Sequence, residues 1–297
     1  MSDGSRLDDL HSLLDSISLQ SFTNIEIIVV SGGVVNLGSP SPKVKLLKMS
    51  SELGASAARN FAAATATGDI LGFLDDDIIL DSGWCRAAIN AFKNPLVGAV
   101  SGKTLVDLKP IKLEYLPKEL MWVVGGSYWT PLQTTQVFGG TGMNFCVRRN
   151  LFSKVGGYDV KLGPRNERPE FSLWKRLGAE ESELALRILF TTGRRILYEP
   201  SMIAWHRQHW TKETPLRLFK RSLHVGHNRA YIGWRFRNRK AMTSDNLVAA
   251  DLMLGLFTGV NLTEGWKRFS VAATVVAGVL LGYLVGKLEY RYSSHHQ

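Results

Sequence analysis

Hydrophobic and polar positions over the first two thirds of the chain follow the periods of helices and strands in alternation. Residues 6–20 have the spacing of an amphipathic helix, with Leu7, Leu10, Leu14 and Ile17 on one face. The Ile- and Val-rich run NIEIIVV follows, and the two glycines behind its serine predict a buried strand that ends in a turn. A strand that is apolar on both faces indicates a layered sheet.

The following segments repeat this order of strand and helix. Residues 54–67 are rich in helix formers and end at Gly68, after which DILGFL predicts a second strand. Asp81 is placed to cap a helix over GWCRAAINAF, and PLVGAVSGKTLV predicts a further strand. Helices are also expected at 148–156 and 180–192, with a strand at RRILYEP. This alternation is typical of the α/β class.

The C-terminal third has a different pattern, and we expect the chain to divide into three parts. These are an α/β domain over 1–212, a basic amphipathic segment over 213–245 and an apolar membrane-anchor region over 246–297. Residues 269–286 are uncharged, and a helix of that length covers about 27 Å, enough to span the hydrocarbon core. Basic and aromatic residues flank this segment on both sides, which fits the headgroup level but leaves its orientation open.

A second apolar segment, residues 247–262, is shorter and contains Asp251. An interfacial helix, one half of a membrane hairpin and a core helix are all compatible with it.

Charge is unevenly distributed along the chain. The sequence holds 36 Lys and Arg against 26 Asp and Glu, a net charge of +10, which fits either nucleic acid or an anionic membrane. Between Thr214 and Ser244 there are basic residues and no acidic ones, so the rest of the chain is nearly neutral. Because this stretch leads into an apolar segment and no nucleic-acid motif is recognisable, we expect an anionic membrane surface as partner and no nucleic acid.

Cysteine usage and the N-terminus bear on the compartment. Cys85 and Cys146 form neither a disulfide framework nor a zinc spacing, which indicates a reducing compartment and a metal, if any, held by oxygen and imidazole ligands. The first twenty residues lack the apolar run of a signal peptide. We therefore expect the α/β domain to face the cytoplasm.

Two acidic groups and one histidine are candidates for chemistry. Asp75, Asp76 and Asp77 follow an apolar strand and repel one another; a divalent cation would relieve this and neutralise a diphosphate, although a solvated turn is the alternative. Glu180, Glu181 and Glu183 begin a predicted helix, where a crowded carboxylate suits a general base but acidic residues also simply favour the helix dipole. His206 follows a strand-like run and is either a metal or phosphate ligand or a packed histidine.

Eight segments, in this order and spacing, resemble the family 2 glycosyltransferases of GT-A fold over about residues 5–210: IEIIVV, GASAARN, GDILGFLDDD, GW, PLVGAVSGK, GGTGMNFCVRRNLFSKVGGYD, GAEESELALRI and ILYEPSMIAWH. Each segment alone is a weak signal, but the ordered set is specific. The resemblance implies an α/β GT-A fold with a Rossmann-like layered sheet, followed by a helical, membrane-associated C-terminal region.

The resemblance also implies roles for individual residues. Asp75 and Asp77 match the two ends of the DxD motif, with Asp77 as the direct metal ligand, and His206 matches a histidine that contacts the metal or the diphosphate. Glu181 falls at the catalytic base, with Glu180 as the preceding member of an acidic pair. The implied cofactor is a divalent metal, Mn²⁺ or Mg²⁺, and the implied reaction is inverting transfer.

Further residues match the family's donor pocket. The implied donor-binding set is Ser31, Arg59, Asn60, Asp75, Asp76, Gly139, Gly140 and Asn144, of which Arg59 and Asn60 form the ARN motif and the two glycines face the sugar.

Two features depart from the family pattern. Family members open with a central strand and a Pro-Thr turn before the first helix, whereas this sequence starts at the helix, so we expect a mis-called start codon or another segment in that place. VVSGG replaces the usual VVDDGS and puts Ser31 where an aspartate contacts the base. The donor base, UDP or GDP, therefore cannot be read from the motif.

These observations predict an inverting, metal-assisted glycosyltransferase at the cell membrane. It would move a sugar from a UDP- or GDP-linked donor to an acceptor hydroxyl or a lipid-linked glycan. The missing strand and Ser31 support the alternative of a weak or inactive relative that binds nucleotide or glycan as a partner subunit. A sugar-phosphate nucleotidyltransferase would require a Gly-rich, Arg-containing N-terminal loop, and none is present in the sequence.

Overall fold

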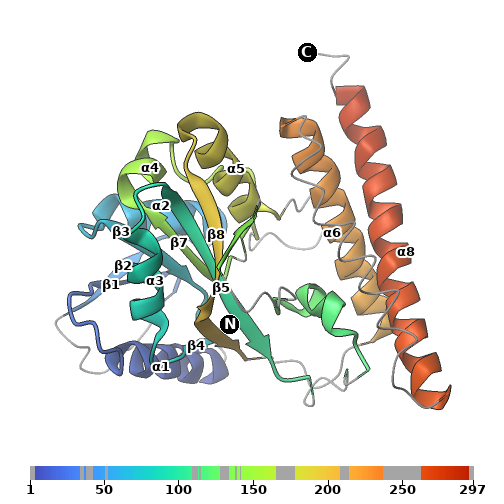
Figure 1. Ribbon diagram of the computed structural model, residues 1–297, viewed down its shortest axis with the longest axis horizontal. Coiled ribbons are helices and arrows are strands. Elements are labelled where there is room, and N and C mark those ends of the chain that lie inside the picture. The colour runs from blue at the N-terminus through green and yellow to red at the C-terminus, as the bar shows by residue number, and fades with distance from the viewer. Residues whose placement is uncertain are drawn as a thin grey trace. The chain divides into compact units, whose positions relative to one another are not determined.

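The computed structural model describes residues 4–33, 37, 43–50, 53–108, 113, 115–127, 134–137, 139–140, 142–164, 178–207, 214–236 and 262–293. The chain divides into two compact units (Figure 1). The first unit comprises Met1–Leu105, Thr130–Ser172 and Glu180–Arg207. The second unit comprises Val106–Trp129, Leu173–Ala179 and Gln208–Gln297.

The first unit alternates strands and helices along the chain. In order, its elements are α1 (Gly4–Ser18), β1 (Ile27–Ser31), β2 (Val44–Lys48), α2 (Gly54–Thr65), β3 (Ile70–Leu74), β4 (Ile78–Leu80), α3 (Trp84–Phe92), β5 (Val97–Val106), β6 (Thr135–Val137), β7 (Asn144–Arg148), α4 (Arg149–Lys154), α5 (Glu180–Thr192) and β8 (Arg195–His206). The helices expected over 54–67, 148–156 and 180–192 are confirmed as α2, α4 and α5.

A mixed six-stranded sheet forms the centre of this unit. Five strands lie in the order β3-β7-β5-β8-β4, and β6 also pairs with β8. Strands β3 and β5 run antiparallel to β7, while β4 and β6 run antiparallel to β8. Strands β1 and β2 form a separate parallel pair. The α/β fold class expected from the sequence is confirmed.

Helices cover both faces of the six-stranded sheet, because side chains that alternate along its strands point to opposite sides. On one face Leu13 of α1 and Trp84 and Phe92 of α3 pack with Cys146 of β7. On the other face Phe145 of β7 packs with residues from α4 and α5. The sheet is therefore the middle of three layers, and the loops at its strand ends are held between rigid elements.

Glu26 ties the beginning of β1 to the segment that precedes β3. Its Oε1 accepts hydrogen bonds from Thr67 N at 2.6 Å, Thr67 Oγ1 at 2.7 Å and Gly68 N at 2.9 Å. These hydrogen bonds, the one from the Thr67 hydroxyl most of all, lower the pKa of Glu26 to about 2. Among the described residues β1 pairs only with β2 and β3 only with β7, so each of the two has one side without a strand partner.

The first helix differs in detail from the expectation. Leu7, Leu10, Leu14 and Ile17 are only partly buried, whereas Asp9, Leu13 and Ser16 of α1 are buried, as is Gln20 just after the helix. Polar contacts cause this rotation of the buried face. Ser16 Oγ accepts a hydrogen bond from Leu80 N, and the Gln20 amide bonds to Asp81 O and Cys85 N.

The start of α3 also differs. This helix begins at Trp84 without a side-chain cap, and the Asp81 carboxylate instead accepts a hydrogen bond from Gly83 N at 2.9 Å. The aspartate therefore closes the turn that leads into the helix.

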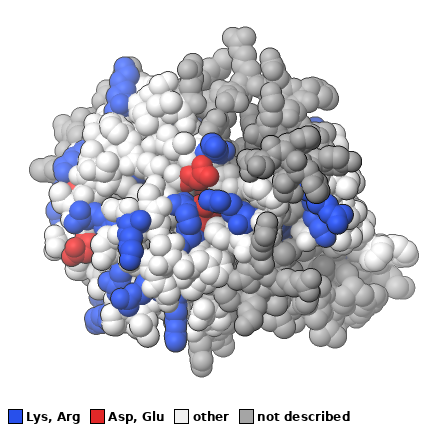
Figure 2. Space-filling view, turned by 90° about the horizontal axis from the view of Figure 1, so that it is seen from above, with Lys and Arg blue, Asp and Glu red and all other residues white. Residues whose placement is uncertain are grey.

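The described part of the second unit is helical. It contains a 3₁₀ helix, η2 (Lys118–Val124), and two long helices, α6 (Pro215–Phe236) and α8 (Leu262–Ser293). In the described part of the chain, Gly265–Arg291 is the one helical stretch long and apolar enough to cross a membrane. The expected second apolar segment, apart from Leu262, lies outside the described residues, as do Arg237, Arg239 and Lys240 of the basic segment. Figure 2 shows a face with many more Lys and Arg than Asp and Glu side chains, in keeping with the net charge of +10.

Candidate active site

Strand pairing brings Asp77 and His206 together. Asp75 directly follows β3 and Asp77 directly precedes β4, so the three aspartates form the turn between these strands. In the β4–β8 pair, Ile78 lies opposite His206, and His206 Nε2 is 3.5 Å from Asp77 Oδ2. Arg207 N also donates to Asp77 O at 2.9 Å, which fixes the backbone of the turn.

Arg59 of α2 connects this turn with the acidic start of α5. Its Nη2 donates to Asp75 Oδ1 at 3.0 Å, and its Nη1 donates to Glu181 Oε1 at 2.7 Å and to Glu180 Oε1 at 3.1 Å. Burial disfavours the cation, but Glu181 and Asp75 outweigh it and raise the pKa of Arg59. One guanidinium therefore faces three carboxylates, and when all three are ionised the cluster is negative overall.

Glu181 is the carboxylate with a raised pKa in this cluster. Its side chain is 9% exposed, and burial, followed by the neighbouring Glu180, raises its pKa well above the usual value, while Arg59 opposes the increase. Ala179, directly before α5, has a φ of 66°, a strained conformation for a residue other than glycine. A raised carboxyl pKa beside a strained helix start is typical of functional sites.

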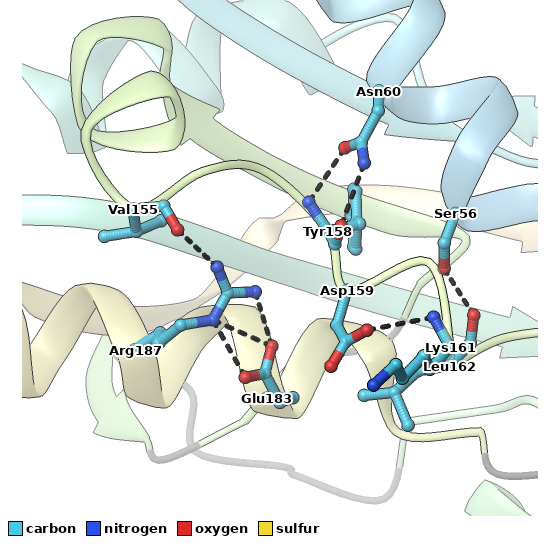
Figure 3. A network of polar contacts seen from close by, with 9 residues as sticks. All are labelled: Ser56, Asn60, Val155, Tyr158, Asp159, Lys161, Leu162, Glu183 and Arg187. Atoms are coloured by element: carbon cyan, nitrogen blue, oxygen red, sulfur yellow. Dashed lines mark hydrogen bonds and ion pairs between the residues drawn. The ribbon is translucent and has the colours of Figure 1, made fainter.

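The ring of Tyr158 packs against the guanidinium of Arg59. The guanidinium carbon is 5.5 Å from the centre of the Tyr158 ring, a cation–π contact. The Asn60 amide fixes the Tyr158 backbone, since its Nδ2 donates to Tyr158 O and its Oδ1 accepts from Tyr158 N, both at 2.8 Å (Figure 3).

Two further side chains hold the same loop in place. Ser56 Oγ donates to Leu162 O at 2.7 Å, and Arg187 donates to Val155 O (Figure 3). Arg187 is itself fixed by the fully buried Glu183, four residues earlier on α5. Side chains from α2 and α5 thus position the loop over 155–162, which carries Tyr158.

The glycine-rich segment before β7 packs against the start of α5. A Cβ atom on Gly142 would lie 2.1 Å from Glu181 Oε1, and one on Gly139 would lie 2.9 Å from Ser182 Oγ. A Cβ on Gly140 would lie 2.6 Å from the Phe145 ring. Only glycine allows the backbone to approach the acidic pair this closely.

Three residues of the expected donor-binding set make other contacts. Ser31 ends β1, and its hydroxyl is hydrogen-bonded to the backbone of Gly33. Asn144 is fully buried, accepts from Trp84 Nε1 and donates to Lys103 O and Met202 O. Asp76 forms a half-exposed ion pair with Arg6 at 3.7 Å, and burial raises its pKa.

The sequence reasoning did not single out Tyr158 or Gly142. Both lie inside segments that carry the family resemblance, Gly142 in GGTGMN and Tyr158 in VGGYD. Their contacts to Arg59 and Glu181 come from segments far apart in the chain, so only the folded structure shows them.

Of the three expected metal ligands, whose oxygen and nitrogen atoms suit Mn²⁺ or Mg²⁺, the fold brings Asp77 and His206 together. Among the described residues no three His, Cys, Asp or Glu side chains are placed to hold one metal ion. Asp77 and His206 form a pair of oxygen and nitrogen donors, whereas Asp75 is held by Arg59. Ions of this kind commonly take one or two protein ligands together with substrate phosphates and water, so the pair fits such a site.

Comparisons with known proteins identify the family of the chain. The family described as Glycosyl transferase family 2 matches residues 5–156. A glucosyl-dolichyl phosphate glucuronosyltransferase of Haloferax volcanii is 26% identical over 207 residues, covering 65% of this chain and 62% of the relative. The O-antigen biosynthesis protein RfbC of Myxococcus xanthus is 26% identical over 219 residues, covering 66% of this chain and 16% of the relative. The chain thus spans less than two thirds of the length of either relative.

Two solved structures share the fold. The mannosyltransferase PcManGT from Pyrobaculum calidifontis, in complex with GDP-Man and Mn²⁺, has a TM-score of 0.56 at 17% identity and covers 95% of this chain and 82% of its own. GalNAc-T7 with UDP, GalNAc and Mn²⁺ has a TM-score of 0.50 at 15% identity and covers 75% and 48%. From the family match over half of its length, this chain belongs to glycosyl transferase family 2 and has a GT-A-like fold.

Proposed function

We propose that this chain is an inverting glycosyltransferase, which moves a sugar from a nucleoside-diphosphate donor to an acceptor hydroxyl. The observation that carries the proposal is the cluster in which Arg59 joins the buried Glu181 to Asp75 at the end of β3. It combines a carboxylate of raised pKa with the strand end where α/β sheets place their ligands.

In the proposed step Glu181 is the general base. Its carboxylate takes the proton of the acceptor hydroxyl, whose oxygen bonds to the anomeric carbon while the bond from that carbon to the diphosphate oxygen breaks. Attack in line with the leaving group inverts the configuration. The raised pKa makes Glu181 a stronger base than an ordinary carboxylate, and Glu180 contributes to that increase.

Donor binding is proposed for the same end of the sheet. Asp77 and His206, with Asp75 close by, would hold a divalent cation, which supplies neutralisation of the diphosphate charge as it leaves. The structures of PcManGT and GalNAc-T7 both hold Mn²⁺ together with a nucleotide or nucleotide sugar. Arg59, Gly139 and Gly140 would line the donor site, and Asn60 would act through Tyr158.

Three more residues of the expected set have less direct places in this proposal. Asn144 would act by shaping the sheet beside the donor site, and Asp76 would lie at the rim of that site. Ser31 would lie beside the nucleotide base of the donor.

The acceptor and the location are further parts of the proposal. The Haloferax volcanii relative is named for a dolichyl phosphate-linked substrate, which supports a lipid-linked acceptor here. An apolar helix, α8, and a basic helix, α6, support attachment to an anionic membrane, with residues 1–212 as the catalytic domain on the cytoplasmic side.

The function is tested by the stereochemistry of transfer. The full chain is incubated with UDP- and GDP-linked sugars, Mn²⁺ and a lipid-linked acceptor. NMR of the glycosylated acceptor reports the anomeric configuration of the transferred sugar. We expect a product with the configuration opposite to that of the donor. A retained configuration would contradict the mechanism, and nucleotide binding without any transfer would favour the inactive partner subunit.

The metal site is tested by calorimetric titration with UDP and GDP. We expect binding that requires Mn²⁺ and is lost in Asp77→Ala, whereas the control Asp15→Ala, at an exposed position of α1, binds as the parent does. Equal binding with and without Mn²⁺ would contradict the proposed role of Asp77.

A further inference from the structure

Helices α6 and α8 pack through glycines at very short distance. A Cβ atom on Gly226 would lie 2.0 Å from Val279 O, and one on Gly282 would lie 2.0 Å from Leu223 O. Gly278 and Gly286, four residues before and after Gly282, would place a Cβ 2.7 Å from Cβ atoms on α6. The two backbones are therefore in direct contact, and α6 and α8 form one structural unit, the α6–α8 pair.

The side of α8 away from α6 is an exposed apolar stripe. Val276, Leu280, Leu284 and Leu288 recur every four residues and are 39%, 58%, 59% and 58% exposed. Leu280, Leu284 and Leu288 each lie two residues after a glycine that contacts α6. Since successive residues turn by about 100°, two residues place these leucines on the opposite side. The glycines thus face α6, and the leucine stripe faces outward.

The side of α6 away from α8 is basic. Arg217 and Arg235 lie nine residues before and after Gly226, a rotation that again points to the opposite side, and both are exposed. Lys220 is exposed as well, and α6 contains five basic residues and no acidic one. In cross-section the pair therefore has a basic outer side on α6 and an apolar outer side on α8.

This distribution does not suit a pair that crosses a bilayer. The contacts place Ser222 and Ala230 of α6 beside Gly278 and Gly286, within the apolar part of α8. If α8 spanned, Arg221, His224 and Arg229 would be carried to the depth of the hydrocarbon, where charged side chains are costly. If the pair lies in the plane of the membrane, the apolar side of α8 can contact lipid while the basic side of α6 stays in water.

We propose that the α6–α8 pair attaches to an anionic lipid surface by lying in its plane and does not cross the bilayer. The leucine stripe of α8 enters the boundary of the acyl chains, and the basic side of α6, on the opposite side of the pair, faces water. Lys267 and Arg268 near one end of α8 and Lys287 and Arg291 near the other reach the headgroups. This inference rests on the proposed membrane attachment and replaces the expected span at 269–286.

The orientation is tested with one cysteine at each end of α8. The full chain with Trp266→Cys and Arg291→Cys is reconstituted into sealed vesicles of phosphatidylcholine and phosphatidylglycerol, floated, treated with a membrane-impermeant maleimide and analysed by mass spectrometry. The native Cys85 and Cys146 are buried, and the parent chain gives their background.

The two orientations give different numbers of labels per molecule, whichever way the protein was inserted. An in-plane helix has both ends on the same side, so we expect molecules with two labels or none. Molecules with one label would overturn the proposal, since a spanning helix exposes one end only. Failure of the parent to float would contradict attachment itself, and sugar transfer measured in detergent is independent of both outcomes.

A charge reversal tests the basic ends of α8. Lys267→Glu with Lys287→Glu, both exposed, is expected to weaken binding to vesicles containing phosphatidylglycerol by at least about tenfold at low salt, and to leave weak binding to pure phosphatidylcholine unchanged. Lys154→Glu, at the exposed end of α4, is the matched control and should bind as the parent does. Equal binding of the double variant and the control would overturn the proposed orientation.

Discussion

At the scale of residues, the site depends on one cation shared among several carboxylates. Arg59 keeps Glu180, Glu181 and Asp75 together in a part of the first unit that is largely buried. Without it, three carboxylates would repel one another at short range. The same residue limits how far burial raises the pKa of Glu181, so it adjusts the base that the proposed mechanism uses.

Arg59→Gln should therefore change the pH dependence of transfer. A base acts in its ionised form, so activity rises with pH through the pKa of Glu181. Because Arg59 lowers that pKa, its removal raises the pKa, and the acid side of the kcat profile moves to higher pH. Arg59→Lys should retain more of the parent profile, and Arg86→Gln, an exposed arginine on α3, should leave it unchanged. If Arg59→Gln lowered kcat equally at every pH without moving the acid side of the profile, the effect of Arg59 on the pKa of Glu181 would be refuted.

Gly142→Ala should reduce transfer by moving the carboxylate of Glu181. The added Cβ meets Oε1 at 2.1 Å, so either the loop or the base must shift. A displacement of about 1 Å near the reacting atoms can cost about a hundredfold in rate. Gly33→Ala is the control, because a Cβ there has no heavy atom within 4 Å. Transfer rates of the two variants that agree within error would show that this contact is not important.

At the scale of elements, rigid helices and strands bring distant segments to one place. The pairing of β4 with β8 sets Asp77 beside His206, and side chains of α2 and α5 fix the loop that carries Tyr158. Glu26 does the same for β1 and the segment before β3, which are linked by its carboxylate and not by a strand ladder.

Glu26→Gln should lower stability at neutral pH and lose that effect in acid. The folded-state pKa of about 2 lies below the unfolded value of 4.5, so the stabilisation is present above 4.5 and is lost as the pH falls toward 2. Denaturant unfolding of parent and variant across this range measures the difference. Asp15→Gln, at an exposed position of α1, serves as control. A difference between parent and Glu26→Gln that stays constant down to the lowest pH would contradict this account.

The sequence predicted most of the helices and longer strands of the first unit, because their apolar patterns are local. It did not predict β2, β4, β6 or β7. Strands β4 and β6 have three residues each and exist only through pairing with β8. The acidic residues were candidates from their places after a strand and at a helix start, and Arg59 was identified through the family resemblance. Their mutual contacts, and those of Tyr158 and Gly142, depend on tertiary packing and could not be read from spacing.

At the scale of the whole molecule, the chain combines a sheet-based unit that carries the chemistry with a helical unit suited to a lipid surface. The chemistry is proposed for residues of the first unit alone, and attachment for the α6–α8 pair alone. The two properties should therefore be separable by mutation.

Leu280→Glu with Leu284→Glu should abolish flotation with vesicles and leave transfer to a soluble acceptor unchanged. Both leucines are more than half exposed on the stripe, at 58% and 59%, so their replacement removes apolar area from the lipid contact without opening a cavity in the protein. Leu96→Glu, an exposed leucine of the first unit, is the control and should float. Loss of transfer together with flotation would show that the two properties are coupled.

The central claim is that Glu181 is the base of a sugar transfer, and the most direct test is the transfer rate of Glu181→Gln. We predict that kcat falls by about 10²–10⁴-fold, as is typical when a general base is removed, while Mn²⁺-dependent nucleotide binding survives. The raised pKa means that ionised Glu181 costs stability as the pH rises, so the variant should be at least as stable as the parent at neutral pH. Glu199→Gln, at a partly buried glutamate of β8 outside the acidic cluster, should retain full activity. A Glu181→Gln protein that transfers sugar at the parent rate would contradict the account.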